Sequence, residues 1–163
     1  MNNSNNEDML NILRDLERKI LWLSCWTIDQ ANRGDKVDGV KVGGHQASSA
    51  SMVSIMTALY FDVLRPEDRV AVKPHASPVF HAIQYLMGNQ TREKLQNFRG
   101  YGGAQSYPSR TKDVDDVDFS TGSVGLGVAI TAFSSLIQDY IKAKSWSLKE
   151  MPDGRMIALV GDA

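Results

Sequence analysis

Apolar residues recur every three or four positions in the first part of the chain, which is the spacing of a helix with one buried face. The positions that carry this pattern are Leu10, Leu13, Leu16, Ile20 and Leu23. We therefore predict a polar tail over residues 1–8 and then a helix from about Asp8 to Ala31. Gly34 follows the last periodic residues and provides a natural helix stop.

Similar patterns predict four more helices farther along the chain. The small residues after His45 favour a helix that packs closely against its neighbours, and Pro66 ends it, because the residue before a proline avoids the helical region. Serine and proline at Ser77 and Pro78 suit the start of the next helix. The predicted helices run from Ala47 to about Leu64, Ser77 to about Met87, Thr91 to Phe98 and Val128 to about Lys144.

Two short segments are predicted to be strands. Arg69–Lys73 alternates in sequence, with β-branched valine at every second position, and Met156–Val160 is apolar throughout. A strand that is apolar on both faces is typical of a parallel sheet covered by helices on both sides. The alternation of helices and strands predicts a three-layer α/β domain over residues 9–163, with helices on both faces of a mostly parallel sheet.

The segment from Arg99 to Gly127 shows neither pattern and is rich in glycine. A loop of this length inside a compact domain is usually functional or disordered, and we favour a functional role. Within it, the acidic run Lys112–Asp118 is interpreted as a solvated face of the loop.

Composition narrows the class of protein. The 163 residues carry a formal net charge of -1, which argues against a nucleic-acid-binding surface. No apolar run approaches the roughly 20 residues that span a bilayer, and the polar start lacks a secretory signal. Cys25 is the single cysteine, so a disulfide framework and a cysteine zinc cluster are excluded, and we expect a buried, inert thiol. A cytoplasmic location is expected.

Candidate chemistry follows the two predicted strands. One strand leads to His75 and the other leads to Gly161 and Asp162. Ligands of open α/β sheets gather outside the carboxyl ends of the strands, where a carboxylate is a natural ligand of Mg²⁺. The alternative for Asp162 is that it caps a following helix.

Three glycines before the predicted helix at Val128 form a second candidate. Gly122, Gly125 and Gly127 allow the backbone to approach a ligand closely, and the positive N-terminus of the helix favours an anion. The alternative is a tight turn with close helix packing. The segment is not a nucleotide P-loop, because no Gly-Lys-Ser/Thr follows it.

Two further histidines have different expected roles. His45 stands just before a helix start, where it suits proton transfer or, alternatively, a plain polar position at the helix start. His81 falls within a predicted helix, and we interpret it as structural because no other polar group was expected to converge on it.

Four motifs occur together in the order "GGHQASSASM", "VAVKPHASPVFHAIQYLMG", "FSTGSVGLG" and "ALVGDA". In this order they resemble the first domain of the transketolase superfamily, which binds thiamine diphosphate. The stretch "NFRGYGGAQSYPS" is more similar to the homodimeric, decarboxylating component of pyruvate dehydrogenase than to transketolase proper. Two departures are Ser109, where that component often has histidine, and Ala163, where many members have glycine.

The resemblance implies roles for individual residues. His75 is expected to contact the cofactor near its diphosphate and reacting carbon, and His45 to act as a proton-transfer group facing the substrate. Asp162 is expected to ligate Mg²⁺. Backbone groups that line the cofactor rings, and the turn before the metal ligand, are expected at Gly122, Ser123, Val124 and Gly161.

The resemblance also implies a reaction. The expected enzyme cleaves a carbon–carbon bond next to a carbonyl in a 2-oxo acid or ketose and transfers the resulting acyl or ketol fragment. Alternatives are ketol transfer between sugar phosphates, as in transketolase proper, and a non-catalytic dimerising fragment. A homodimer or a complementing C-terminal subunit is the expected partner.

The family's metal motif continues with an asparagine, and a later domain carries a glutamate that activates the cofactor. Neither follows Asp162 in the present sequence. We therefore expect the N-terminal portion of a longer enzyme, inactive by itself.

Overall fold

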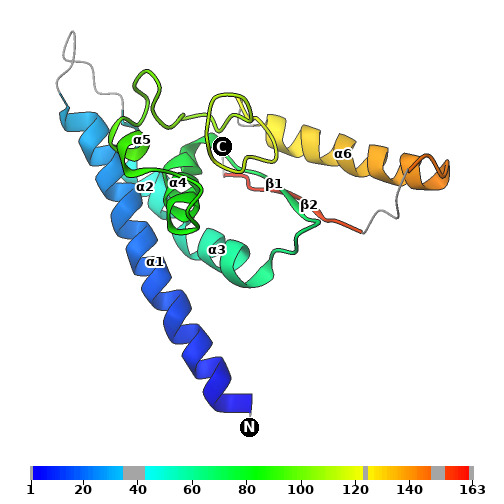
Figure 1. Cartoon of the computed structure of the whole chain (residues 1–163), viewed down its shortest axis with the longest axis horizontal. Coiled ribbons are helices and arrows are strands. Elements are labelled where there is room, and N and C mark those ends of the chain that lie inside the picture. Colours follow the sequence, from blue (N-terminus) through cyan, green and yellow to red (C-terminus); the bar gives the residue numbers. More distant parts are fainter. Residues whose placement is uncertain (1, 35–42, 123–124, 148–152, 162–163) are drawn as a thin grey trace.

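The computed structural model describes residues 2–34, 43–122, 125–147 and 153–161, and it is an α/β structure (Figure 1). Six α-helices, a π-helical turn, a 3₁₀ turn and two strands occur in these residues. In chain order they are α1 (Asn2–Arg33), α2 (Gln46–Ala50), α3 (Val53–Ala58), the π turn (Leu59–Val63), β1 (Arg69–Ala71), the 3₁₀ turn (Pro74–Ala76), α4 (Ser77–Leu86), α5 (Arg92–Gln96), α6 (Leu126–Ala143) and β2 (Met156–Ala158).

Helix α1 is the longest element and runs along one side of the molecule (Figure 1). Of the predicted apolar positions, Ile20 and Leu23 are buried, Leu13 and Leu16 are half-buried, and Leu10 is 52% exposed. The predicted apolar face is therefore confirmed only toward the C-terminal half of the helix. The helix begins at Asn2, before the predicted start near Asp8. Polar residues can extend a helix once it is nucleated, because each added residue gains a hydrogen bond without a new nucleation cost.

The helix predicted from Ala47 to Leu64 is divided into α2, α3 and the π turn. At the break, the Ser51 hydroxyl donates to the Ser48 carbonyl at 2.9 Å. Serine side chains compete in this way for backbone groups and weaken a helix interior. The last turn ends at Val63, as Pro66 predicted.

The two strands are parallel, as predicted, and each has three residues. Their register pairs Val70 with Ile157 and Ala71 with Ala158. Val70 belongs to the apolar core formed with α1, α3 and α4, whereas a Cβ on Gly127 of α6 would lie 3.4 Å from the Ala71 Cβ. Helices therefore cover both faces of the sheet, which confirms the predicted class (Figure 1).

Strand β2 is half-buried, whereas the apolar sequence predicted a fully buried strand. Within the described residues, β2 pairs only with β1, so it is an edge strand. A second neighbour is needed to bury a strand completely, and the described sheet provides none.

A buried carboxylate joins the starts of the two strands. Asp68 accepts hydrogen bonds from the backbone amides of Arg65 and Arg155, at 2.9 and 2.8 Å, and from the Arg155 guanidinium. The hydrogen bonds from Arg155 hold the pKa of Asp68 well below its usual range. The guanidinium also donates to the Val63 carbonyl at 2.8 Å. These bonds set the register in which β1 and β2 begin.

The long loop is irregular, as predicted, but its acidic run is not a solvated face. Asp113 accepts from the backbone amides of Gln105 and Ser109 at 2.9 and 2.8 Å. Asp118 accepts from the Val70 amide at 2.8 Å and so covers an edge of β1. Asp115 is buried. The carboxylates point inward because they accept hydrogen bonds from buried backbone amides that have no partner in a helix or a sheet.

Helices able to cross a bilayer, judged by length and apolar character, are absent from the described part of the chain.

Candidate functional site

Helix α1 positions His45. The Gly43 amide donates to the Asn32 side chain at 3.0 Å, and the Gln46 side chain donates to the Cys25 carbonyl at 3.3 Å. A Cβ atom on Gly43 would collide with the Ile28 carbonyl, so only glycine lets the loop lie this close to α1. Cys25 itself is half-buried, less buried than expected.

The imidazole of His45 is not used to start α2. The backbone of His45 is extended, and its side chain makes no capping hydrogen bond to the helix. His45 is nevertheless the N-cap residue of α2, and its carbonyl accepts from the Ser49 amide at 3.3 Å, so the structure also fits the alternative of a plain polar position at the helix start. The side chain is exposed and faces a pocket.

The 3₁₀ turn after β1 positions His75. The Ala76 amide donates to the Lys73 carbonyl at 2.9 Å, and Ala76 and Ser77 on either side of the turn's end are buried. The backbone is thus fixed from within while the His75 side chain stays exposed. Pro78 then occupies the first turn of α4, as predicted.

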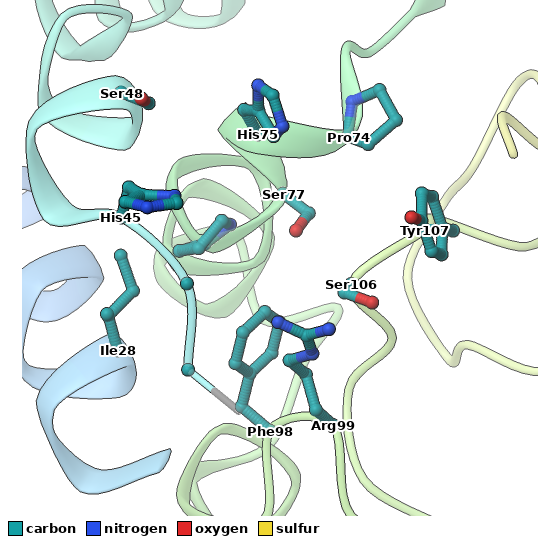
Figure 2. Close-up of a pocket in the computed structure, with 13 residues that line it drawn as sticks. Ile28, His45, Ser48, Pro74, His75, Ser77, Phe98, Arg99, Ser106 and Tyr107 are labelled. Carbon is teal, nitrogen blue, oxygen red and sulfur yellow. The ribbon is translucent and has the colours of Figure 1, made fainter. Parts of the chain in front are cut away.

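His45 and His75 line the same pocket, which has a volume of about 340 Å³ (Figure 2). The two histidines for which the resemblance implied roles beside cofactor and substrate therefore lie in one pocket, and those roles stay predictions. The opposite wall is formed by the start of the long loop, with Phe98, Arg99, Ser106 and Tyr107. The pocket lies between α1, the start of α4 and this loop.

Arg99 is a pocket residue that the sequence analysis did not single out. Among the described residues that line this pocket, Arg99 alone is a lysine or arginine. Its backbone has a φ of 65°, a conformation that costs energy for a residue with a side chain. A hydrogen bond of 2.9 Å from the Arg99 amide to the Ala104 carbonyl holds this conformation. The unusual φ could not be anticipated, since it depends on this contact within the loop.

Gly122 and Gly161 lie near the carboxyl ends of the strands. The Thr121 hydroxyl donates to the Val72 carbonyl at 2.8 Å, which places Gly122 just beyond β1. Gly161 follows β2, and a Cβ on it would lie 2.5 Å from the Lys73 Nζ, again just beyond β1. Ser123, Val124 and Asp162 lie outside the described residues.

The surroundings of the glycines differ. A Cβ on Gly122 or Gly125 would meet no atom of the described residues within 4 Å, whereas Gly127 packs against Ala71. Close helix packing, the alternative raised above, thus accounts for Gly127. It does not account for Gly122.

A separate cluster of His81, Asp113 and Asp115 has the composition of a metal site. Its groups already bind one another and the backbone. His81 Nδ1 bonds Asp115, His81 Nε2 lies 2.7 Å from the Gln105 carbonyl oxygen, and Gln90 donates to Asp115 at 2.8 Å. The structural role predicted for His81 is confirmed, although polar groups converge on it, contrary to expectation. The cluster fastens the long loop to α4.

Comparison with known proteins gives one consistent result. The chain is similar to pyruvate dehydrogenase E1 components. It is 29% identical to that of Mycolicibacterium smegmatis over 91% of this chain. It is 28% identical to that of Escherichia coli strain K12 over 94% of this chain, and 31% identical to that of Pseudomonas aeruginosa over 80%. No family model matches the chain.

The match covers 17%, 18% and 16% of these three relatives, so the chain spans about a sixth of their length. The pocket walls follow the motifs that suggested the same relationship. The stretch "NFRGYGGAQSYPS" provides Phe98, Arg99, Ser106 and Tyr107, and the motifs around His45 and His75 provide the facing wall.

Proposed function

We propose that this chain is the N-terminal portion of a thiamine-diphosphate-dependent enzyme that decarboxylates a 2-oxo acid. The observation that carries the proposal is the shared pocket of His45, His75 and Arg99 at the carboxyl side of β1. Pyruvate dehydrogenase E1 relatives support a 2-oxo acid substrate over a ketose. These relatives give no support to ketol transfer between sugar phosphates.

The residues of the chain suit the cofactor. The space beside Gly122 is free of described atoms within 4 Å, so a ligand can approach the backbone there. The N-terminus of α6, which begins at Leu126, adds a positive partial charge nearby. We assign the backbone of Gly122, Ser123 and Val124 to the cofactor rings and the turn at Gly161 to the diphosphate end. Asp162 is the proposed Mg²⁺ ligand.

Thiamine diphosphate, when bound, supplies the electron sink that lets the bond beside the 2-oxo group break. The chain's own residues bind, orient and move protons. Arg99 pairs with the carboxylate of the substrate, for which a guanidinium has the matching planar geometry. His45 and His75 hold or deliver protons on the opposite wall, and histidine suits this task near neutral pH.

A further polypeptide segment is part of the proposal. Helix α6 exposes Phe133, Leu136, Ile137 and Tyr140, each more than half exposed. An apolar patch of this kind on a soluble surface marks an interaction site. We propose that sequence equivalent to the remainder of the relatives covers it, in the same or another polypeptide, and that this assembly, including a homodimer, completes the active site. By itself the chain is proposed to be inactive.

Calorimetric titration of the chain with thiamine diphosphate and Mg²⁺ tests this function. We expect saturable binding that weakens at least tenfold in Asp162→Asn and in His75→Ala. Asp116→Asn is the matched control, because the Asp116 side chain is exposed and does not line the pocket of His45 and His75. Equal binding by all variants, or no binding by the chain and by the chain with its complementing segment, would contradict the proposal and leave the non-catalytic alternative.

A further inference from the structure

The hydroxyl of Ser77 points into the candidate pocket. Ser77 is the first residue of α4 and lines the pocket, although the residue as a whole is only 1% exposed. Its oxygen is directed at the space between His75 and Arg99 (Figure 2). Within the described part of the chain, the Ser77 side chain forms no hydrogen bond. Packing therefore fixes the position of this hydroxyl while its hydrogen-bonding capacity is not used by the fold.

Ser49 shows what a serine that serves only packing looks like in the same structure. It is also 1% exposed, and its hydroxyl has no hydrogen-bond partner, but that hydroxyl is fully enclosed and Ser49 does not line the pocket. The hydroxyl of Ser77, in contrast, opens on the pocket. A ligand that enters the pocket can therefore accept a hydrogen bond from Ser77 without breaking any bond of the protein.

The charged groups around Ser77 indicate that this ligand is an anion. A Cβ on Gly44 would lie 3.9 Å from the Arg99 Nη1, so the guanidinium extends across the pocket toward the loop that leads to His45. The described residues that line the pocket include no aspartate or glutamate. The N-terminus of α4, which begins at Ser77 and Pro78, adds a positive partial charge. A guanidinium in such surroundings matches the planar geometry of a carboxylate.

The rest of the pocket indicates what is attached to the carboxylate. Ile28 and Phe98 contribute apolar side chains to the wall, and these suit a short apolar group. Ser77 adds a second donor beside the guanidinium, and this donor suits an oxygen on the carbon next to the carboxylate. A 2-oxo acid carries both acceptors, whereas a simple carboxylic acid carries only the carboxylate.

We propose that Ser77 is a specificity-determining residue of the pocket. Its hydroxyl donates to the 2-oxo oxygen of a short 2-oxo acid whose carboxylate pairs with Arg99. The inference deepens the proposed function and rests on it for the class of substrate. Because the hydroxyl gains a partner only when the carbon next to the carboxylate carries an oxygen, Ser77 favours 2-oxo acids over plain carboxylic acids.

The test is a titration of the chain, followed by NMR, with pyruvate and with propionate, which lacks the 2-oxo oxygen. We expect the unmodified chain to bind pyruvate about three- to tenfold more tightly than propionate, which corresponds to one neutral hydrogen bond. In Ser77→Ala the two acids should bind equally, with propionate affinity unchanged. Ser49→Ala is the matched control and should keep the preference. Arg99→Met should weaken the binding of both acids.

A second measurement separates a ligand-binding hydroxyl from a structural one. Without ligand, Ser77→Ala should keep or raise the urea midpoint, because it removes a buried hydroxyl that has no partner in the described fold. A lower midpoint would show that the hydroxyl supports the fold and would overturn the inference. A preference for pyruvate that survives in Ser77→Ala would overturn it as well, and so would a lack of pyruvate binding or of any preference in the unmodified chain.

The two proposals fail in different ways. If the chain prefers pyruvate through Ser77 but does not bind thiamine diphosphate with Mg²⁺, the Ser77 assignment stands and the proposed cofactor is wrong. If thiamine diphosphate binds as expected and Ser77→Ala still prefers pyruvate, the proposed function stands and the Ser77 assignment is wrong.

Discussion

His81 and Asp115 form a fully buried pair that joins helix α4 to the long loop, with both side chains at 0% exposure. The imidazole faces an acceptor on each side, the Asp115 carboxylate at Nδ1 and the Gln105 carbonyl at Nε2. Both nitrogens must donate, so the ring is an imidazolium. Because Ser106 and Tyr107 follow Gln105 directly, this pair also holds one wall of the candidate pocket.

Replacing Asp115 with asparagine should destabilise the chain strongly. The change leaves the His81 imidazolium buried without its counter-ion, and breaking a buried pair in this way costs about 3–5 kcal/mol. Urea unfolding at pH 6 measures the loss. Asp116→Asn changes an exposed neighbour with the same chemistry and should stay within about 0.5 kcal/mol of the unmodified chain. Similar stability for both variants would show that the pair is not ionised.

Stability should fall as the pH rises above neutral. Burial by itself lowers the pKa of His81, but the hydrogen bond and charge of Asp115 outweigh it, and the pKa is raised above 6.5. Below pH 6.5 the folded and unfolded states are both protonated, so the contribution of His81 is fully present there. It is lost as the pH rises through the raised pKa, at up to about 1.4 kcal/mol per pH unit.

Urea unfolding across pH 6 to 9 checks this slope, and His81→Gln removes the titrating group. The variant should be less stable at pH 6, and the difference from the unmodified chain should narrow toward pH 9. A difference that stays constant across the range would contradict a protonated His81. His75→Gln, at an exposed histidine, should keep the slope of the unmodified chain.

Gly43→Ala should push the His45 loop away from α1. The added methyl group would collide with the Ile28 carbonyl and lie 2.9 Å from the Asn32 Cγ, so the loop must move. We expect a loss of about 1–3 kcal/mol in the free energy of unfolding. Gly125→Ala is the control, since its Cβ would meet nothing within 4 Å and its φ is -86°. Equal stability of the two variants would contradict the close contact.

Gly122→Ala should weaken ligand binding without changing the stability of the fold. Because no described atom lies within 4 Å of the added Cβ, the free energy of unfolding should change by less than about 0.5 kcal/mol. Binding of thiamine diphosphate with Mg²⁺ should weaken tenfold or more, which corresponds to about 1.4 kcal/mol. Calorimetric titration and urea unfolding of the same preparation measure both. Undiminished affinity would exclude a close cofactor contact at this glycine.

Much of the architecture could be predicted from local patterns. Helix α6 covers nearly the predicted span, Thr91 caps α5 by accepting from the Lys94 amide at 3.3 Å, and the two strands are parallel. His75 was expected at the carboxyl side of the sheet because it follows a predicted strand, whereas its shared pocket with His45 is a result of the structure. The predicted start of α1 and the prediction of one unbroken helix through Ser51 were wrong, because both depend on small differences in helix propagation.

The helices, the strands and their α/β class follow from the amino-acid sequence alone, because they depend on periodicity and on short-range signals. The roles of His45 and His75 were expected only through the resemblance to the transketolase superfamily. The tertiary structure alone decided where the charges go. Asp115 meets His81 across 34 residues, Lys73 meets the turn at Gly161, and Arg99 turns toward the pocket through a strained backbone. A buried charge is costly unless a partner of opposite charge or a hydrogen bond compensates it. Those partners are distant in sequence and come into place only when the loop folds back on the sheet.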